Sequence, residues 1–317
     1  MANITRAASI GDKQALRIIW KTAFGDSDEE IDDFFSFYFA PQVAIVVDNG
    51  SDPIAAGYLL PVGNLLCGGM KVPCAMIYAV ATLPEYRNHG YGSAVVRGLI
   101  SAGYAKGCKA VVLCPSDNDL FEYYSARTDL HDWFHVSQRK VALTKNKEYR
   151  PSAHISPPVH WPLSPLPLGS SHPLKLTPIK ANEYNCLREE LLLEVPHIEF
   201  DLRALSYQSL LSNHSGGGLF RIDGHSGVGC AVVEKQPGGA VWIKELLTSH
   251  INETDALSSV ALMYPADEYL VRSPSPSPTA DSKTLRFGML ASSDDRILRA
   301  SSEFHDSAAP YYGLAFD

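Results

Sequence analysis

The sequence lacks any excess of basic residues. It has 27 Lys and Arg residues against 35 Asp and Glu residues in 317, a net charge of −8 at pH 7. Proteins that neutralise nucleic-acid phosphates carry a basic surplus, so we expect no nucleic-acid partner. The chain also lacks the roughly 18 uninterrupted apolar residues of a membrane-spanning helix, and Met1 to Arg6 lead into polar sequence without a signal-peptide core. We therefore expect a cytoplasmic protein with no membrane partner.

Cysteines at metal-ligand spacing are also lacking. The six cysteines include no Cys-x-x-Cys pair and no histidine partner at zinc spacing. His131 and His135 form an i, i+4 pair that no carboxylate completes. Cys114 closes the apolar run that begins at Ala110, where a small buried side chain is favoured over a nucleophile. We expect no bound metal and free thiols in a reducing compartment.

What the sequence does contain is an ordinary globular composition, 45% hydrophobic and 20% charged, and enough residues for two domains. Between Thr144 and Ala181 the apolar periodicity stops and prolines accumulate, which indicates an extended connector because proline cannot donate to ladders or helices. We expect an N-terminal domain at 1–146, a connector at 147–180 and a C-terminal domain at 181–317.

The first half is predicted to be mixed α/β. Helical spacing covers Gln14 to Phe24, and Ser27 or Asp28 could cap a second helix. The later elements alternate between strands and helices. They are strands at 43–47, 54–61, 75–82 and 110–114, and helices at 92–106 and 118–127.

The second half repeats this outline more loosely. Two strands, Gly218 to Ile222 and Gly229 to Glu234, bracket a turn. A strand at 240–246, a helix at 253–264 and a strand at 268–271 follow. The sequence from Val112 to Ser116 is similar to that from Leu270 to Ser275, which favours the interpretation that the second half is a copy of the first.

The most informative stretch runs from Val80 to Ala94. A strand leads into a turn with Gly90 and Gly92, and a helix begins where the turn ends. The unpaired amides of a helix start bind anions, and Arg87 could add a fixed charge. A turn shaped only by its two glycines is the alternative. Val95 stands where the dinucleotide fingerprint needs Gly or Ala, and no Gly-Lys-Ser/Thr ends a Walker loop, so both phosphate motifs are rejected.

The pattern Arg-x-x-Gly-x-Gly after Pro84-Glu85-Tyr86 resembles that of the GNAT superfamily of acyl-CoA-dependent N-acyltransferases, and the resemblance covers the whole first half. It implies an α+β mixed sheet, acetyl-CoA as co-substrate and a primary amine, small-molecule or peptidyl, as acceptor. It also implies that the strand end binds the pantetheine arm and that the turn binds the pyrophosphate. The residues so implied are Val80, Ala81, Thr82, Arg87, Asn88, His89, Gly90, Tyr91, Gly92 and Ser93.

The resemblance also implies a general acid. Transfer from a thioester needs a positioned amine, a donor for the oxyanion and an acid for the thiolate. The family's usual acid is a tyrosine on the helix that follows the strand after the turn, and Tyr124 stands at that position in the predicted helix 118–127. The alternative is that Tyr123 and Tyr124 only pack against the rest of the domain. The residues from Arg127 to Leu130 depart from the family's frequent Gly-Phe pair.

Two GNAT-like units, the second degenerate, resemble the enhanced intracellular survival group of acetyltransferases. The second half has no glycine turn after Ile243 to Thr248, which implies that it does not bind CoA in the same way. In that group the terminal carboxylate enters the active site, which makes Asp317 a candidate catalytic residue. A frayed edge strand is the alternative.

The sequence leaves open the identity of the acceptor amine, the choice between alternative functions and the oligomeric state. The resemblance implies a group of carboxylates on the helices that border the acceptor site, where they could attract a cationic amine or could form a solvated acidic helix start. They are Asp26, Asp28, Glu29, Glu30, Asp32 and Asp33. A Fem-like aminoacyl or acyl transferase and a non-catalytic acyl-CoA sensor are the alternative functions. Exposed apolar residues in the second half would suit a homo-oligomer.

Overall fold

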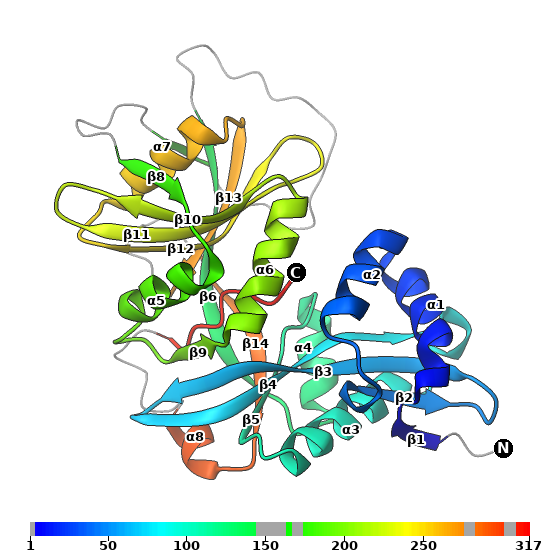
Figure 1. The fold of residues 1–317 in the computed structure, drawn as a ribbon. Helices are drawn as coiled ribbons and strands as arrows, with labels where there is room; N and C mark the ends of the chain where they lie inside the picture. The colour runs from blue at the N-terminus through cyan, green and yellow to red at the C-terminus, as the bar shows by residue number, and fades with distance from the viewer. Residues whose placement is uncertain (1–3, 144–162, 167–173, 276–282, 301–308) are drawn as a thin grey trace. The chain divides into compact units, whose positions relative to one another are not determined.

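The computed structural model describes residues 4–143, 163–166, 174–275, 283–300 and 309–317 (Figure 1). The chain forms two compact units. Unit 1 contains Met1–Phe134 and Arg286–Glu303, and unit 2 contains His135–Leu285 and Phe304–Asp317. These units differ from the expected ranges 1–146 and 181–317, because each unit takes a segment from the other half of the sequence.

Unit 1 follows the predicted alternation of strands and helices closely. Its N-terminal elements are β1 (Ile4–Ala7), α1 (Lys13–Phe24), α2 (Asp28–Phe37), β2 (Ala44–Asp48), β3 (Pro53–Cys67) and β4 (Met70–Thr82). Its later elements are α3 (Tyr91–Ala105), β5 (Ala110–Leu113), α4 (Asn118–Ser125), the first residues of β6 (His131–Leu143), most of β14 (Lys283–Ser292) and α8 (Asp295–Ala300). The sequence did not predict β1, β6, β14 or α8.

The sheet of unit 1 has the strand order β1-β2-β3-β4-β5-β14. β4 and β5 are parallel, with Cys74 opposite Ala110 and Ile77 opposite Leu113. β14 pairs antiparallel with the other edge of β5, from Met289 to Ser292. A segment close to the C-terminus therefore completes the sheet of the N-terminal unit.

Helices cover both faces of this sheet (Figure 1). α3 packs on one face so closely that a Cβ atom at Gly57 of β3 would lie 2.9 Å from Val95 Cγ1. α1 and α2 cover the other face with a cluster of aromatic rings. Trp20 lies 4.5 Å from Phe34 and 5.5 Å from Tyr58, between ring centroids. The aromatic residues of the two N-terminal helices thus fill the space between those helices and the sheet.

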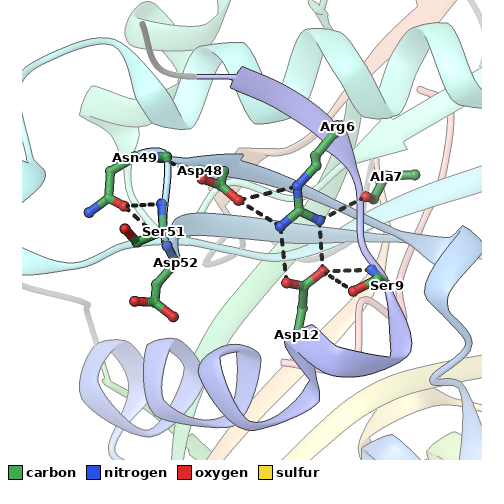
Figure 2. A network of polar contacts seen from close by, with 9 residues as sticks. Arg6, Ala7, Ser9, Asp12, Asp48, Asn49, Ser51 and Asp52 are labelled. Carbon is green, nitrogen blue, oxygen red and sulfur yellow. Dashed lines mark hydrogen bonds and ion pairs between the residues drawn. The ribbon is translucent and has the colours of Figure 1, made fainter. Parts of the chain in front are cut away.

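One arginine joins the first elements of unit 1 (Figure 2). Arg6 of β1 donates to Asp12, at 2.7 and 3.0 Å, and to Asp48 at the end of β2, at 2.7 and 3.2 Å. Asp12 also accepts from the Ser9 amide at 2.6 Å. The network fixes the start of α1 against two strands that are far apart in the sequence.

Unit 2 repeats the order of elements found in unit 1, with β7 (Leu163–Leu166) and β9 (His197–Phe200) as additional strands. Its other elements are β8 (Lys175–Pro178), α5 (Ala181–Leu191), α6 (Leu202–His214), β10 (Gly218–Asp223), β11 (Val228–Lys235), β12 (Val241–Ser249), α7 (Glu253–Met263) and β13 (Glu268–Pro274). Its sheet has the order β8-β10-β11-β12-β13-β6, with β12 and β13 parallel and β6 antiparallel to β13. The predicted tandem arrangement is confirmed, and each unit receives its sixth strand from the other half of the chain.

A buried polar network lies on the α5 and α6 face of unit 2. Arg188 of α5, fully buried, donates to Glu245 of β12 at 2.9 Å, and Tyr184 donates to the same carboxylate at 2.7 Å. Lys244 lies 3.0 Å from Glu234, which also accepts from Gln208 of α6. Buried charges are stable only when paired in this way, so the network fixes how α5 and α6 pack on the sheet.

Two expectations for the C-terminal half need correction. Most of the expected connector lies outside the described residues, but its described parts are not an extended linker, because β7 pairs with β6 and β8 with β10. The alternative of a frayed C-terminal edge strand is wrong, because Tyr311 and Tyr312 are fully buried and the tail forms only an isolated bridge with His197.

None of the helices in the described part of the chain is long and apolar enough to cross a membrane.

Candidate active site

The site begins where β4 separates from β5. The last parallel pair is Ile77 with Leu113, after which β4 continues to Thr82 and pairs only with β3. The edge of β4 that faces away from β3 therefore has no strand partner among the described residues from Ala79 to Thr82. Its backbone amides and carbonyls can bind an extended ligand as a strand neighbour would.

A β-bulge turns this edge of β4. The β3 pairing passes from Tyr58–Tyr78 to Ala56–Ala81, which leaves one extra residue in β4. Ala79 has φ of 48°, in the left-handed region that residues with a Cβ rarely adopt. Bulges redirect the backbone groups that follow them. The sequence did not predict this bulge, because alanine carries no signal for a left-handed conformation.

The turn after β4 is held by its own backbone and side chains. Arg87 Nε donates to Thr82 O at 3.2 Å, and His89 Nδ1 lies 2.7 Å from Arg87 O. Asn88 and Gly90 have φ of 66° and 80°. Because these two residues reverse the chain, the turn presents its amides toward the start of α3, as the glycine pattern predicts.

The N-terminus of α3 is open to an anion. Gly90 is the N-cap and offers no side chain, and the first turn contains no acidic residue. The helical bonds begin with the Ala94 amide, which donates to Gly90 O at 3.1 Å, so the Gly92 and Ser93 amides have no acceptor within the helix. A Cβ at Gly92 would lie 3.7 Å from Tyr123 Oη and 3.9 Å from Thr82 Oγ1, an ordinary contact.

The two tyrosines of α4 differ in position. Tyr124 is 6% exposed and belongs to the core beneath α3, where burial raises its pKa, with further contributions from Tyr123 and Asp117. Tyr123 is half-buried, and its hydroxyl is the atom closest to the position of a Cβ at Gly92. The sequence could not distinguish the two because they are adjacent in one helix.

The structure brings most of the predicted residues together. Those from Val80 to Ser93 lie on one strand end, one turn and one helix start, with the residues from Arg87 to Gly90 exposed and Ser93 buried. Asp317 lies in unit 2, where its carboxylate is 2.7 Å from Arg272 and 3.9 Å from Lys244. Burial would raise the Asp317 pKa, but these two cations outweigh it and lower the pKa to about 2.

Several of the acidic residues near α2 already have partners. Asp28 lies 2.9 Å from Lys21, Asp32 pairs with Arg17, and Asp26 accepts from Trp20 Nε1 at 2.7 Å. Glu30 accepts from Ser27 in a capping box. These contacts favour the interpretation of a capped, solvated helix start over an amine-attracting cluster.

The first unit matches a known protein family. Residues 5–126 match the family model described as an acetyltransferase (GNAT) domain. The chain carries a GNAT acetyltransferase domain. This result confirms the expected family and the expected class of enzyme, an acyltransferase of the GNAT type. No curated protein matches this sequence.

Solved structures share the fold of nearly the whole chain. A GCN5-related N-acetyltransferase from Anabaena variabilis is 15% identical, with 91% of this chain and 72% of that chain covered and a TM-score of 0.64. A GCN5-related N-acetyltransferase from Kribbella flavida is also 15% identical, with 91% of this chain and 71% of that chain covered and a TM-score of 0.62. Eis1 from Mycobacterium abscessus is 11% identical, with 95% and 76% covered and a TM-score of 0.60. The expected similarity to Eis-like tandem GNAT proteins is thus confirmed in the fold.

Proposed function

We propose that unit 1 binds acetyl-CoA and transfers its acetyl group to the primary amine of a small molecule or peptide. The observation that carries this proposal is the junction of the open β4 edge with the uncapped start of α3. In this arrangement the backbone of Val80 to Thr82 would hold the pantetheine arm. The amides from Asn88 to Ser93 would hold the pyrophosphate, with Arg87 adding positive charge.

The transfer we propose is direct. The amine nitrogen attacks the thioester carbonyl carbon, the carbon–nitrogen bond forms, and the carbon–sulfur bond breaks. The thiolate takes a proton from a tyrosine hydroxyl, and the ammonium formed by the attack releases its proton to water. The tyrosinate then regains a proton from water, which restores the acid. Holding both reactants in one site lowers the entropic part of the barrier, so no covalent enzyme intermediate is required.

We propose Tyr124 as the acid and Tyr123 as a residue that contacts the cofactor arm. This division rests on the protonated state that burial imposes on Tyr124 and on the position of the Tyr123 hydroxyl beside Gly92. Asp317 stays a predicted catalytic residue. A variant that lacks Asp317, and with it the terminal carboxylate at this position, but keeps the wild-type kcat and KM would contradict that role.

Calorimetric titration with acetyl-CoA tests the cofactor site. The wild type should bind, and Gly92→Asp should not, because its carboxylate would occupy the pyrophosphate position. Gly92 has room for a Cβ and lacks a left-handed φ, so the variant should fold. Ser101→Asp, which adds the same charge to an exposed position of α3, is the matched control and should bind as the wild type does.

The outcomes separate the candidate functions. Equal affinity of wild type and Gly92→Asp for acetyl-CoA would contradict the assignment of the turn. Binding with no turnover on any amine would favour the acyl-CoA sensor. The burial of Tyr124 is the observation that keeps this alternative open, since a tyrosine in the core can have a purely structural role.

A further inference from the structure

Unit 2 contains a cavity of about 540 Å³. Its walls come from the end of α5, at Leu191, Leu192 and Val195, and from Leu246 to Thr248 of β12. The segment from Ile251 to Thr254, where α7 begins, and Ser273 with Pro274 at the end of β13 also line it. Most of these residues are apolar, and Glu253 is the charged one among them.

This cavity occupies the place in unit 2 that the candidate cofactor site occupies in unit 1. The parallel pairing of β12 with β13 ends at Ile243 and Val271, just as that of β4 with β5 ends at Ile77 and Leu113. Leu246 to Thr248 follow Ile243 at the same interval at which Val80 to Thr82 follow Ile77. A bulge in β12 also parallels the one in β4.

The inner part of the opening in unit 2 is closed by the chain itself. Arg272, the residue after the last parallel pair on β13, donates to Gly313 O at 2.7 Å. A Cβ at Gly313 would lie 2.6 Å from Glu245 Oε1 of β12, so the tail approaches both strands there. The cavity begins beyond this point, and its volume is enough for a small molecule.

The helix start at this cavity differs from that of α3. Asn252 caps α7 by accepting from the Thr254 amide at 2.8 Å, and Glu253 and Asp255 lie in the first turn. The Glu253 carboxylate is 2.7 Å from Arg139 Nη2, and both side chains are largely buried. Burial raises the Glu253 pKa, and Arg139 opposes that shift.

This arrangement of charges disfavours the binding of anions and of cations alike. Asn252 already accepts from one amide of this helix start, and Asp255 places a negative charge in its first turn, so a diphosphate would meet a less positive helix start here than at α3. A cation would have to compete with Arg139 for a carboxylate that is already paired. The apolar walls, the Thr248, Thr254 and Ser273 hydroxyls and the open edge of β12 remain available to an uncharged ligand.

We propose that this cavity binds an uncharged, amide-bearing small molecule of the size of a pantetheine arm and excludes its phosphorylated forms. Amide groups pair with the open backbone edge of β12 and with the hydroxyls, and the apolar body packs against the leucines. This site is separate from the cofactor site of unit 1, and its existence does not depend on the activity of that unit.

The test uses the full chain with labelled leucine methyl groups and S-methylpantetheine as the probe. The titration is done in the Gly92→Asp variant so that CoA, the comparison ligand, does not occupy the site in unit 1. The readout of the probe is local to the leucines that line the cavity of unit 2. We expect saturable shifts of the methyl signals of Leu191, Leu192, Leu246 and Leu247. CoA in the same variant should leave those signals unchanged, because the capped start of α7 with Asp255 in its first turn does not favour its phosphates.

Two variants that fill the cavity from opposite walls keep the test decisive if one fails to fold. Thr248→Trp and Ser273→Phe should each weaken S-methylpantetheine binding by about tenfold or more. Lys235→Trp, at an exposed position of β11, is the control and should bind the probe normally. The proposal would be overturned if S-methylpantetheine did not shift the leucine methyl signals of the cavity, or if CoA shifted them equally. It would also be overturned if a folded Thr248→Trp or Ser273→Phe variant bound S-methylpantetheine with unchanged affinity.

Discussion

Burial raises the pKa of Tyr124 above 10.0, its ordinary value, and Tyr123 and Asp117 add to the shift. The phenol therefore stays protonated through the neutral and mildly alkaline range. An acid that donates to a thiolate must hold its proton at the working pH, and this environment secures that state. The acceptor amine must instead lose its proton.

The first prediction concerns this pH dependence. With acetyl-CoA saturating, kcat/KM for the amine should rise as the amine deprotonates and should show no fall up to pH 10. Tyr124→Phe should lower kcat by about 10²-fold and leave acetyl-CoA affinity unchanged, since general acids contribute about 10²- to 10⁴-fold. Tyr123→Phe should instead raise KM for acetyl-CoA. A Tyr124→Phe enzyme with wild-type kcat would contradict the assignment of the acid.

The second prediction concerns Arg6 and its two carboxylates (Figure 2). The Arg6 hydrogen bonds hold the pKa of Asp12 well below its ordinary 3.8, and those of Arg6 and the Gly50 amide lower that of Asp48. The stabilisation is therefore complete above pH 3.8 and is lost as the pH falls further. Arg6→Met should lower the stability at pH 7 by about 1–2 kcal/mol, because the network is partly exposed to solvent.

Chemical denaturation at pH 7 and pH 3 measures this effect. The difference between wild type and Arg6→Met should shrink at the lower pH, because the carboxylates of the unfolded chain are largely protonated at pH 3, which stabilises the unfolded state of the wild type relative to its folded state. Arg296→Met is the control, since Arg296 bonds Asp294 at an exposed surface and should change stability little. Equal stability of Arg6→Met and wild type at pH 7 would show that the network does not anchor α1.

Among the secondary-structure elements, the contact between α3 and β3 controls the geometry of the site. Gly57 leaves no room for a side chain, because a Cβ there would lie 2.9 Å from Val95 Cγ1, 3.0 Å from Leu99 Cδ1 and 3.1 Å from Val80 Cγ2. Val95 and Leu99 belong to α3, and Val80 to the open end of β4. A larger residue at position 57 would therefore separate the two elements that form the site.

The third prediction is that Gly57→Ala lowers both stability and cofactor affinity. Overpacking of a close contact costs about 1–3 kcal/mol. The melting temperature should fall, and Kd for acetyl-CoA should rise because the α3 amides move away from β4. Gly11→Ala is the control, since a Cβ there lies 3.6 Å from Ser9 Oγ and meets no crowding. A destabilised Gly57→Ala protein with the wild-type Kd for acetyl-CoA would show that the contact between α3 and β3 supports stability but does not control cofactor binding.

The sequence predicted those parts of the site that local chemistry determines. Gly90 and Gly92 between an apolar strand and a helical run indicated the turn, and Ser27 indicated the start of α2. The bulge at Ala79 could not be predicted, because it comes from the pairing of β3 with β4. The burial of Tyr124 likewise depends on contacts with distant segments.

In the molecule as a whole, the exchange of strands limits what sequence order can predict. β5 is a four-residue strand, Ala110–Leu113, and all of its residues are buried. One of its edges pairs with β4 and the other with β14, in which Met289 and Leu290 are fully buried. The proline-rich composition indicated a connector at 147–180, but composition carries no information on which sheet receives a strand.

The fourth prediction follows from this exchange. A fragment of residues 1–146, the domain expected from sequence, lacks β14 and leaves an apolar β5 edge with unpaired backbone groups. Such edges promote aggregation, so the fragment should unfold non-cooperatively or aggregate. Adding a peptide of residues 283–300 should restore a cooperative thermal transition, because it supplies the missing strand and the hydrophobic contacts of Met289. A peptide with Met289→Asp is the control and should fail, since it would bury a carboxylate in the core. A fragment that melts cooperatively without any peptide would show that β14 is dispensable and that unit 1 is complete within the N-terminal half.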